Sequence, residues 1–421
     1  MKSYDLIVLG AGMSGCGAAI AAAREGISVL LVDKSGFLGG AAGNNLVTPF
    51  MRSHTKIDGK DFPLCRGIFA EIQNELMNYG KHTDTAYKYG YFNCEYLKVL
   101  LTEKCIKAGV ELLLHSTLCD LKKEGETIKS ITVTAKGQRF ELAAKRFIDA
   151  SGDADLAAMA GYPFKIGRED GLCQPMTLCF RIAGINREIF DTEYKNIDPL
   201  YKEFKKQGKI KNPREDVLFF NTLDPSVLHF NSTRVIRLNP TDPFDLTRAE
   251  LESQKQMIEL YLFLKNNFES FKNSYISQAA AEIGVRESRM ICGEHTLTGE
   301  EILSLKKPYD TIALGNYDID IHSPTGEGTS HHFFGEGEYY GIPYRCLIPK
   351  NAENLLVAGR CISGTHEAQA SFRIMPIVCC IGEAAGTAIA QLTKTNKSVK
   401  DIDIAALQQT LKNNGALPEK Y

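Results

Sequence analysis

The sequence of 421 residues lacks four features that would point to particular functions. It has no Cys-x-x-Cys motif or other paired cysteine spacing, which argues against a zinc site. It has no excess charge, because 49 basic and 51 acidic residues are interspersed, so a nucleic-acid-binding surface is not expected. It has no uncharged apolar segment of the ~20 residues that cross a membrane, and no polybasic arm.

The twelve cysteines lie mostly in apolar segments, as Cys105 and Cys179 do, and we interpret them as reduced core thiols. Cys379 and Cys380 are adjacent in a predicted helix, where a disulfide would be strained. The first predicted strand begins at Tyr4, which leaves no room for a signal peptide. We therefore expect a cytoplasmic protein that binds small molecules and neither nucleic acid nor membranes. A homo-oligomer is a possible assembly.

The first 33 residues show the pattern of a βαβ unit. Leu6–Leu9 and Val29–Val32 are apolar segments of strand length, and the segment between them is alanine-rich and helical. The glycines of a Gly-x-Gly-x-x-Gly motif lie at the first turn. Gly10 allows the tight turn, Gly12 lets the backbone approach a pyrophosphate at the helix N-terminus, and Gly15 lets the helix close on the strand.

Asp33 ends the second strand, about 20 residues after the glycines. A carboxylate there accepts hydrogen bonds from a ribose 2′-hydroxyl and rejects a 2′-phosphate, which predicts FAD or NAD rather than NADP. A glycine-rich turn that serves packing alone would explain the glycines but not Asp33. The pair Gly39-Gly40 lets the backbone pass close to a ribityl chain and flavin ring, which favours FAD; a flexible loop is the alternative.

The later elements of this domain are predicted at the following residues: helices 67–80 and 94–108, and strands 110–114, 118–122, 128–134, 139–143 and 355–358. Three of these strands form a β-meander. A separate strand from Lys145 then leads to Ser151 and Gly152, which would complete the cofactor crevice. Asp153 and Asp155 are predicted to cap the next helix, with a flavin contact as the alternative.

The composition changes at about residue 161, where glycines become fewer and further strands follow. We predict an α/β fold with a Rossmann-like FAD-binding domain, which contains a parallel sheet and a β-meander, and an inserted α+β substrate domain. The predicted domain limits are 1–165 and 336–421 for the two parts of the FAD-binding domain and 166–335 for the insertion.

Two capping boxes are predicted in the second half of the chain. Thr247–Glu250 would open a long amphipathic helix that runs to about residue 268, and Thr298–Glu301 would open a further one. Between them, Arg286 and Arg289 lie three residues apart. Such a pair can clamp a carboxylate, and a surface or inter-domain ion pair is the alternative.

Residues 318–344 hold three of the nine histidines in a segment without helical or strand period. We expect a loop that lines a site. His322, His331 and His332 could form a metal set, but no acidic or cysteine ligand falls at a fixed spacing, so no metal is predicted. The alternative hypothesis is that a single histidine of this segment transfers a proton in catalysis.

The last predicted helix has its N-terminus at residues 373–377. Pro376 fits its first turn, and the small residues Gly382, Ala385 and Gly386 would let it pack closely on the sheet. Its N-terminus would face the flavin pyrimidine oxygen, where the helix dipole and free N–H groups stabilise negative charge on a reduced flavin.

Both ends of the chain carry motifs that resemble FAD-dependent oxidoreductases of the glutathione-reductase-like, fumarate-reductase-related flavoprotein superfamily. In chain order they are the first-turn glycines with Asp33, Gly39-Gly40, Asp149–Asp155, Val285–Arg289, Ile342–Arg345, and Val357–Arg360 with the helix that follows. The resemblance implies that Gly359 and Arg360 lie at the ribityl phosphate end and that the backbone near Leu118 and Cys119 meets the adenine. The superfamily usually has Glu in place of Asp33.

The resemblance fixes no substrate. The His-Gly-Ala-Asn-Arg arrangement of fumarate reductases is absent, so direct fumarate reduction is not expected. The predicted cofactor is FAD, bound non-covalently. The predicted cofactor-binding residues are Gly10, Gly12, Met13, Ser14, Gly15, Asp33, Lys34, Gly39, Gly40, Ala41, Leu118, Cys119, Ser151, Gly152, Asp153, Gly359, Arg360, Ile374 and Met375.

The predicted activity is hydride transfer between flavin N5 and a small polar substrate of hydroxy, keto or enoate type. His366 would be the acid or base and Arg373 would hold an anionic or carbonyl oxygen, because both precede the last helix. A satisfied loop histidine and an arginine paired with an acid are the alternatives. The further catalytic candidates are His331, His332, Arg286 and Arg345.

Two other functions remain open at this stage: a flavoprotein with a non-redox role, such as an isomerase or hydratase, and a nucleotide-sensing binding protein. Only one Gly-x-Gly-x-x-Gly unit lies in a βαβ setting, so no separate NADPH domain is predicted. The electron donor or acceptor is therefore unknown.

Overall fold

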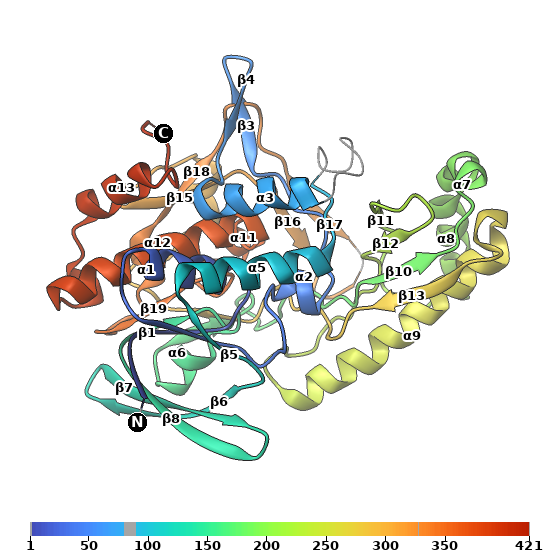
Figure 1. Cartoon of the computed structure of the whole chain (residues 1–421). Coiled ribbons are helices and arrows are strands. Elements are labelled where there is room, and N and C mark those ends of the chain that lie inside the picture. The colour runs from blue at the N-terminus through green and yellow to red at the C-terminus, as the bar shows by residue number, and fades with distance from the viewer. Residues whose placement is uncertain (1, 80–89, 327, 421) are drawn as a thin grey trace.

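The computed structural model describes residues 2–79, 90–326 and 328–420. Its largest sheet contains seven strands: β1 Lys2–Leu9, β2 Val29–Val32, β5 Glu111–Leu113, β6 Thr117–Glu124, β7 Thr127–Ala135, β8 Gln138–Asp149 and β19 Leu355–Val357. β5, β2, β1, β8 and β19 pair in parallel, while β6, β7 and β8 form an antiparallel meander (Figure 1). The predicted α/β fold is thus confirmed.

Strand β8 joins the meander to the parallel sheet. Residues 138–143 pair with β7, and residues 142–149 pair with β1. The prediction of two separate strands here is wrong, because no turn residue separates Ala143 from Lys145 and the pairing continues through Ala144. β8 ends beside the first glycine turn, where Ala150 N donates to Leu9 O at 2.7 Å.

Four helices lie on one side of this sheet: α1 Met13–Arg24, α3 Gly67–Tyr79, α5 Cys94–Ala108 and α12 Met375–Thr395. The predicted helices at 67–80 and 94–108 are confirmed by α3 and α5, although residue 80 lies outside the described residues. α5 ends at Gly109 in the left-handed conformation. The meander and α6 Asp155–Met159 share a second core on the other side.

Helix α12 packs directly on α1. A Cβ added to Gly382 would lie 1.9 Å from Ser14 O, and one added to Gly386 would lie 2.1 Å from Ala18 O. These glycines therefore serve contact with α1 rather than with the sheet, which corrects the prediction. Among the described residues, α12 is the one helix long and apolar enough to cross a membrane, but 94% of its apolar window is buried inside the protein. It is a core helix.

We expect Gly382→Ala to lower the free energy of unfolding by about 3 kcal/mol, because its Cβ would overlap Ser14 O and force the two helices apart. Chemical denaturation measures this value. Thr395→Ala at the exposed end of the same helix is the control, with an expected change below about 0.5 kcal/mol. A similarly small change for Gly382→Ala would show that α1 and α12 can separate at little cost.

Glu383 of α12 is buried beneath the start of α3. Its Oε2 accepts a hydrogen bond from Ile68 N at 2.9 Å, and only 3% of the residue is exposed. Burial raises the pKa of this carboxyl to about 7, although the bond from Ile68 opposes the shift. Glu383 therefore takes up or releases a proton near neutral pH.

The raised pKa makes stability depend on pH. Between the unfolded-state pKa and about pH 7, the folded protein holds this proton while the unfolded chain does not, so the free energy of unfolding falls as pH rises through that window. This one group can contribute at most about 3 kcal/mol. We expect Glu383→Gln to remove that contribution, because glutamine keeps an acceptor for Ile68 and cannot ionise. Urea unfolding of both proteins at about pH 5 and about pH 8 tests this, and parallel pH profiles would contradict it.

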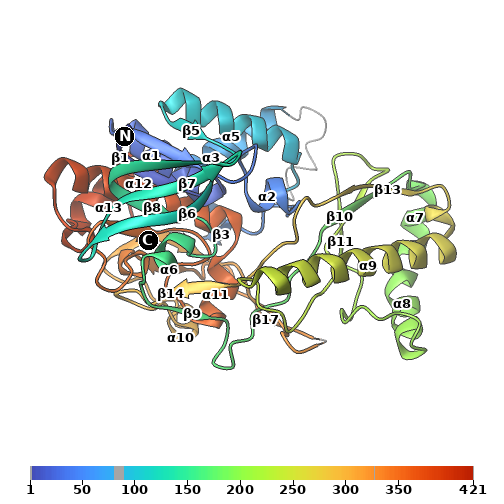
Figure 2. The ribbon, with the colours of Figure 1, turned by 90° about the horizontal axis from the view of Figure 1, so that it is seen from below.

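A second layer lies to one side of the molecule and is formed by residues that fall, in the sequence, between β9 Phe164–Ile166 and β14 Arg289–Ile291 (Figure 2). Its sheet has the order β11–β12–β10–β13, from strands Phe219–Asn221, Leu228–Phe230, Phe180–Ala183 and Tyr275–Ala279. One face packs on the helices α7 Arg187–Glu193, α8 Ile197–Lys206 and α9 Pro243–Asn267. The predicted domain limits at residues 165 and 335 stay a prediction.

The remaining elements are short: α2 Ala41–Asn44, β3 His54–Ile57, β4 Lys60–Pro63, α10 Gly299–Leu303, β15 Thr311–Gly315, β16 Ile319–His322, β17 Thr329–His332, β18 Tyr340–Pro343, α11 His366–Phe372 and α13 Ile404–Asn413. The segment 318–344 is not the predicted loop, since β16 pairs with β17 and β18 pairs with β15. Its strands have four residues each, which is too short for a period to be visible in the sequence.

Helix α9 begins earlier than predicted. Asp242 is its N-cap, accepts two backbone N–H groups of the first turn, and precedes Pro243. Thr247 lies inside the helix and donates to Pro243 O at 2.7 Å. The capping-box prediction is wrong here because Asp242, an N-cap followed by Pro243, already starts the helix before Thr247. At α10 the predicted capping box of Thr298 and Glu301 is confirmed.

Candidate active site

The turn between β1 and α1 requires two of its glycines for packing. Gly10 has φ +97°, and a Cβ there would lie 2.4 Å from Ala150 O. A Cβ on Gly15 would lie 1.8 Å from Gly10 O. Both glycines thus allow the close approach of backbone segments that the motif predicted.

Gly12, Ser14, Gly40 and Gly359, which we call the cradle, surround the start of α1. A Cβ on Gly40 would lie 2.7 Å from Gly12 Cα, whereas a Cβ on Gly12 would meet only Gly40 Cα within 4 Å, at 3.9 Å. Gly12 caps α1 without a side-chain acceptor. Ser14 Oγ is buried and has no hydrogen-bond partner among the described residues. An anionic pyrophosphate would satisfy these donors, so the cradle fits FAD.

Asp33 holds the turn before α1. Its Oδ2 accepts from Ala11 N at 2.5 Å, and its Oδ1 accepts from Ser35 N at 2.7 Å. Ser116 N donates to Asp33 O at 2.9 Å, which places the start of β6, with Leu118 and Cys119, next to the end of β2. The proposed contacts of these residues with ribose and adenine stay predictions.

Asp153 binds side chains instead of capping α6. Its Oδ1 accepts from Arg360 Nη2 at 2.6 Å and from Ser288 Oγ at 2.5 Å. Asp155 pairs with Arg289 at 2.9 Å, and the N-cap of α6 makes no side-chain bond. The capping prediction is therefore wrong, because arginine partners engage both carboxylates. These bonds attach the segment around residue 288 to the cofactor domain.

One face of α11 and its C-cap carries three polar side chains. His366, Gln369 and Arg373 have the spacing i, i+3, i+7, which places them in one row. The segment with Arg286 and Glu287 runs along this row, since Gln369 Nε2 donates to Arg286 O at 2.7 Å and His366 bonds Glu287. We call these five residues the α11 row.

His366 and Glu287 form a buried pair. His366 Nδ1–H donates to Glu287 Oε1 at 2.8 Å, and the two side chains are 5% and 0% exposed. Glu287 Oε2 accepts from Gln174 N at 2.8 Å, so the carboxylate is held at both oxygens. In a neutral imidazole with its proton on Nδ1, the lone pair lies on Nε2. Within the part of the chain that the structure describes, this buried Nε2 has no partner, which leaves it able to exchange a proton with a ligand.

Asp320 of β16 gathers the polar groups at the other end of the row. Its Oδ2 accepts from Tyr317 Oη at 3.1 Å and from Arg373 Nη2 at 3.3 Å, and His322 Nε2 lies 3.4 Å away. Burial alone would raise the pKa of Asp320, but the bond from His322 and the charges of Arg373 and Arg286 hold that pKa well below its usual range. Burial and the charge of Arg286 lower the pKa of His322 to about 3, so this imidazole is neutral.

Arg286 lies close to the same group. Its Nη1 donates to Pro175 O at 2.7 Å and to Thr177 Oγ1, and its Nη2 donates to Asn231 Oδ1 at 3.1 Å. All three acceptors are neutral. Burial and the nearby charge of Arg373 lower the pKa of Arg286 to about 9. Arg289, by contrast, makes the ion pair that was the alternative prediction for both arginines.

The other candidates lie outside the α11 row. His331 and His332 are exposed on β17, with His331 Nδ1 at 3.6 Å from Asp320 Oδ1. Arg345 pairs with the buried Asp310 at 2.9 Å. Among the described residues, no group of three histidine, cysteine, aspartate or glutamate side chains is arranged to hold a metal ion.

The start of α12 lies directly after the row. Ile374 is its N-cap, without a side-chain acceptor, and Met375 is its first residue. The helix therefore presents free backbone N–H groups beside Arg373, as the sequence predicted.

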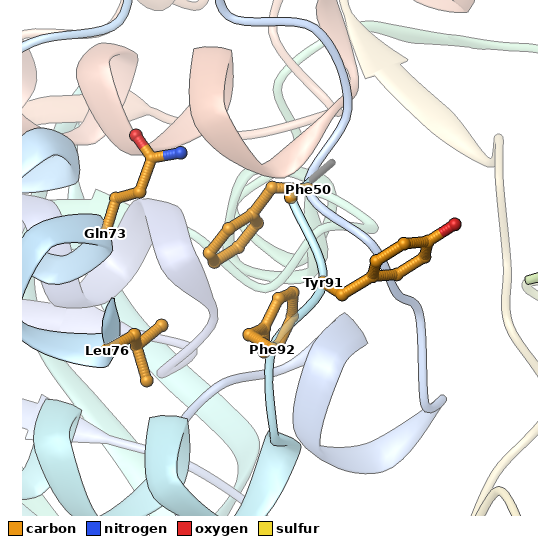
Figure 3. A pocket seen from close by; sticks show the side chains of 6 residues that line it. Phe50, Gln73, Leu76, Tyr91 and Phe92 are labelled. Atoms are coloured by element: carbon orange, nitrogen blue, oxygen red, sulfur yellow. The ribbon is translucent and has the colours of Figure 1, made fainter. Parts of the chain in front are cut away.

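A small pocket lies elsewhere, near the start of α5. Figure 3 shows Phe50 and Phe92 next to Gln73, Leu76 and Tyr91, and the two phenylalanine rings stack with centroids 4.1 Å apart. Its lining is largely apolar and contains no residue of the α11 row or the cradle. The chemistry of the candidate site is therefore not expected there.

Sequence reasoning missed Glu287 and Asp320. Glu287 lies within the motif Val285–Arg289, but 79 residues separate it from His366, so only the fold reveals the pair. Asp320 lies two residues before His322 in the segment predicted as a loop. An acid at this spacing from a histidine was a usable signal once the segment had been recognised as a strand, because residues i and i+2 share one face.

Comparison with solved structures finds remote similarities. A geranylgeranyl bacteriochlorophyll reductase-like protein from Thermoplasma acidophilum is 12% identical, with 99% of this chain and 85% of that chain covered and a TM-score of 0.45. The p-nitrophenol 4-monooxygenase PnpA from Pseudomonas putida DLL-E4 is 10% identical, with 95% and 82% covered and a TM-score of 0.47. Similarities this remote carry no argument about substrate.

No curated protein matches the sequence. The sequence model of a protein family described as FAD dependent oxidoreductase matches residues 5–411 of this chain. This range is nearly the whole chain and includes the cradle and the α11 row. The chain belongs to the FAD dependent oxidoreductase family.

Proposed function

We propose that this enzyme transfers a hydride between flavin N5 and a small polar substrate of hydroxy, keto or enoate type. FAD supplies the redox chemistry when it is bound. The observation that carries the proposal is the buried Glu287–His366 pair, whose Nε2 has no partner among the described residues. Ser288, the residue after Glu287, is bonded to Asp153, which attaches this pair to the cofactor domain.

The protein contributes orientation and proton transfer. Glu287 holds the His366 ring in the tautomer with Nδ1–H, so that Nε2 can take a proton from a substrate hydroxyl. In the reverse direction the proton returns to the carbonyl oxygen, or to the α-carbon of an enoate, while the hydride goes to the other atom of the double bond. Arg373 would hold a substrate oxygen, since Asp320 binds its Nη2 and fixes the guanidinium. Burial of the pair excludes water from the proton transfer.

The test has two steps. The visible spectrum of the purified protein, before and after acid precipitation, shows whether FAD is bound and whether it is released, as expected for a non-covalent cofactor. An anaerobic screen of hydroxy acids, alcohols and their oxidised or unsaturated counterparts then identifies a compound that bleaches the flavin or reoxidises it after reduction. FAD that is bound but unchanged by turnover of a substrate would favour a non-redox role.

Three finer features belong to the same proposal. Relation to fumarate-reductase-related flavoproteins is supported by motifs at both ends of the chain. A cytoplasmic location is supported by the twelve free cysteines. The electron partner would reach the flavin through the substrate site, because one dinucleotide motif is present.

A further inference from the structure

We propose that the substrate is an organic acid whose carboxylate binds between Arg286 and Arg373, while its reacting carbon lies towards His366. This inference rests on the proposed function and names its substrate class.

Arg286 is held in place but not neutralised. A guanidinium has five N–H donors. Three of them are used by Pro175 O, Thr177 Oγ1 and Asn231 Oδ1, all on Nη1 and Nη2. These three bonds leave two N–H donors of Arg286 for other acceptors. No carboxylate of the described residues forms an ion pair with Arg286. A positioned arginine of this kind suits a bidentate carboxylate.

Arg373 has donors to spare as well. Its Nη2 binds Asp320, while its Nε is buried without a partner among the residues that the structure describes. Asp320 also accepts from Tyr317 and lies 3.4 Å from His322, which is neutral, so this carboxylate is shared among several neighbours and binds Arg373 through Nη2. Both arginines therefore keep N–H donors that a carboxylate ligand would bind.

The geometry of α11 links these donors to the proton-transferring pair. Gln369 binds the backbone of Arg286, and it stands between His366 and Arg373 on the same helix face. Seven residues of helix span about 10 Å along the axis. In the proposed complex the acid engages an arginine with its carboxylate and directs a carbon towards His366 Nε2. A second acceptor is available for a substrate hydroxyl, because Asp320 Oδ1 is buried and unbonded within the described residues.

The experiment measures binding without turnover. Lactate, pyruvate, malonate and succinate are titrated into the FAD-loaded protein by calorimetry, with lactamide and succinamide as uncharged counterparts. We expect at least one acid to bind at least about 10-fold more tightly than its amide, and Arg286→Gln and Arg373→Gln each to weaken that acid by about 10-fold or more. Arg187→Gln, which removes a surface arginine bonded to Asp191 and Asn221, should leave the affinity unchanged.

The FAD content and thermal midpoint of each variant show whether it has folded. If the arginine variants fail to fold, the comparison of acid with amide on the unmodified protein still decides the question. Equal binding of acids and amides, or no binding of either, would overturn the inference. If a neutral compound bleaches the flavin while no acid binds, the proposed hydride transfer stands and the carboxylate site is wrong. Acid binding without flavin chemistry would instead reject the proposed function.

Discussion

Replacement of His366 by alanine should leave FAD content unchanged and lower turnover by about 100-fold or more. The expected loss follows from the removal of the one imidazole in the α11 row whose Nε2 is buried without a partner among the described residues. The rate of flavin bleaching by the identified substrate, measured anaerobically in a stopped-flow instrument, tests this directly. Unchanged turnover with normal flavin would remove His366 from the mechanism.

Two further variants separate a proton-transfer role from a structural one. Glu287→Gln keeps the shape of the pair but can present an N–H to His366 Nδ1, which would then favour the other tautomer and lower the rate. His54→Ala, at an exposed histidine on β3, is the control and should behave as the unmodified protein. A rate loss that is restored by added imidazole in His366→Ala would identify the missing group as a base or acid.

Replacement of Gly12 by valine should give a folded protein that has lost FAD. The backbone at Gly12 has φ −70°, which other residues adopt, and its Cβ would meet only Gly40 Cα at 3.9 Å. The added side chain would occupy the open space in front of α1 where the pyrophosphate is expected. FAD affinity should fall at least about 10-fold, since a single hydrogen bond to a charged group is worth about 1.5–3 kcal/mol.

The affinity is measured by titrating FAD into the apoprotein and following flavin fluorescence. The thermal midpoint of the apoprotein should be close to that of the unmodified apoprotein. Ala23→Val, which enlarges a side chain near the other end of α1, is the matched control and should keep normal affinity. Normal FAD affinity in Gly12→Val would place the pyrophosphate elsewhere, and an unfolded protein would show that the space in front of Gly12 is filled by the chain itself.

The parts of the fold predicted correctly from the sequence are those in which local signals agree with burial. β2 has the predicted bounds because a continuous apolar segment is buried on both faces of a parallel sheet. Helix α5 also has its predicted bounds, since Asn93 caps its start and Gly109 ends it. Gly10 and Gly15 were assigned correctly, because a Cβ on either residue would overlap the backbone beside it, whereas the pyrophosphate contact of Gly12 stays a prediction.

The rest depended on long-range contacts. β16 and β17 were missed because a four-residue strand shows no period, and only their mutual pairing defines them. The partner of His366 was missed because a carboxylate far away in the sequence gives no local sign of its role. Asp153 and Asp155 were assigned as caps from their position, whereas arginines from distant segments bind them. Pairwise side-chain partners of this kind are properties of the fold.

The assembly of the cradle constrains when the cofactor can bind during protein synthesis. The cradle draws Gly12 and Ser14 from the first helix and Gly359 from near the other end of the chain, and Gly382 of α12 closes on Ser14. A nascent chain whose helix α12 has not yet emerged from the ribosome lacks one wall of the site. FAD loading is thus expected to be a post-translational event, and chains truncated before α12 should accumulate as targets for proteolysis without cofactor.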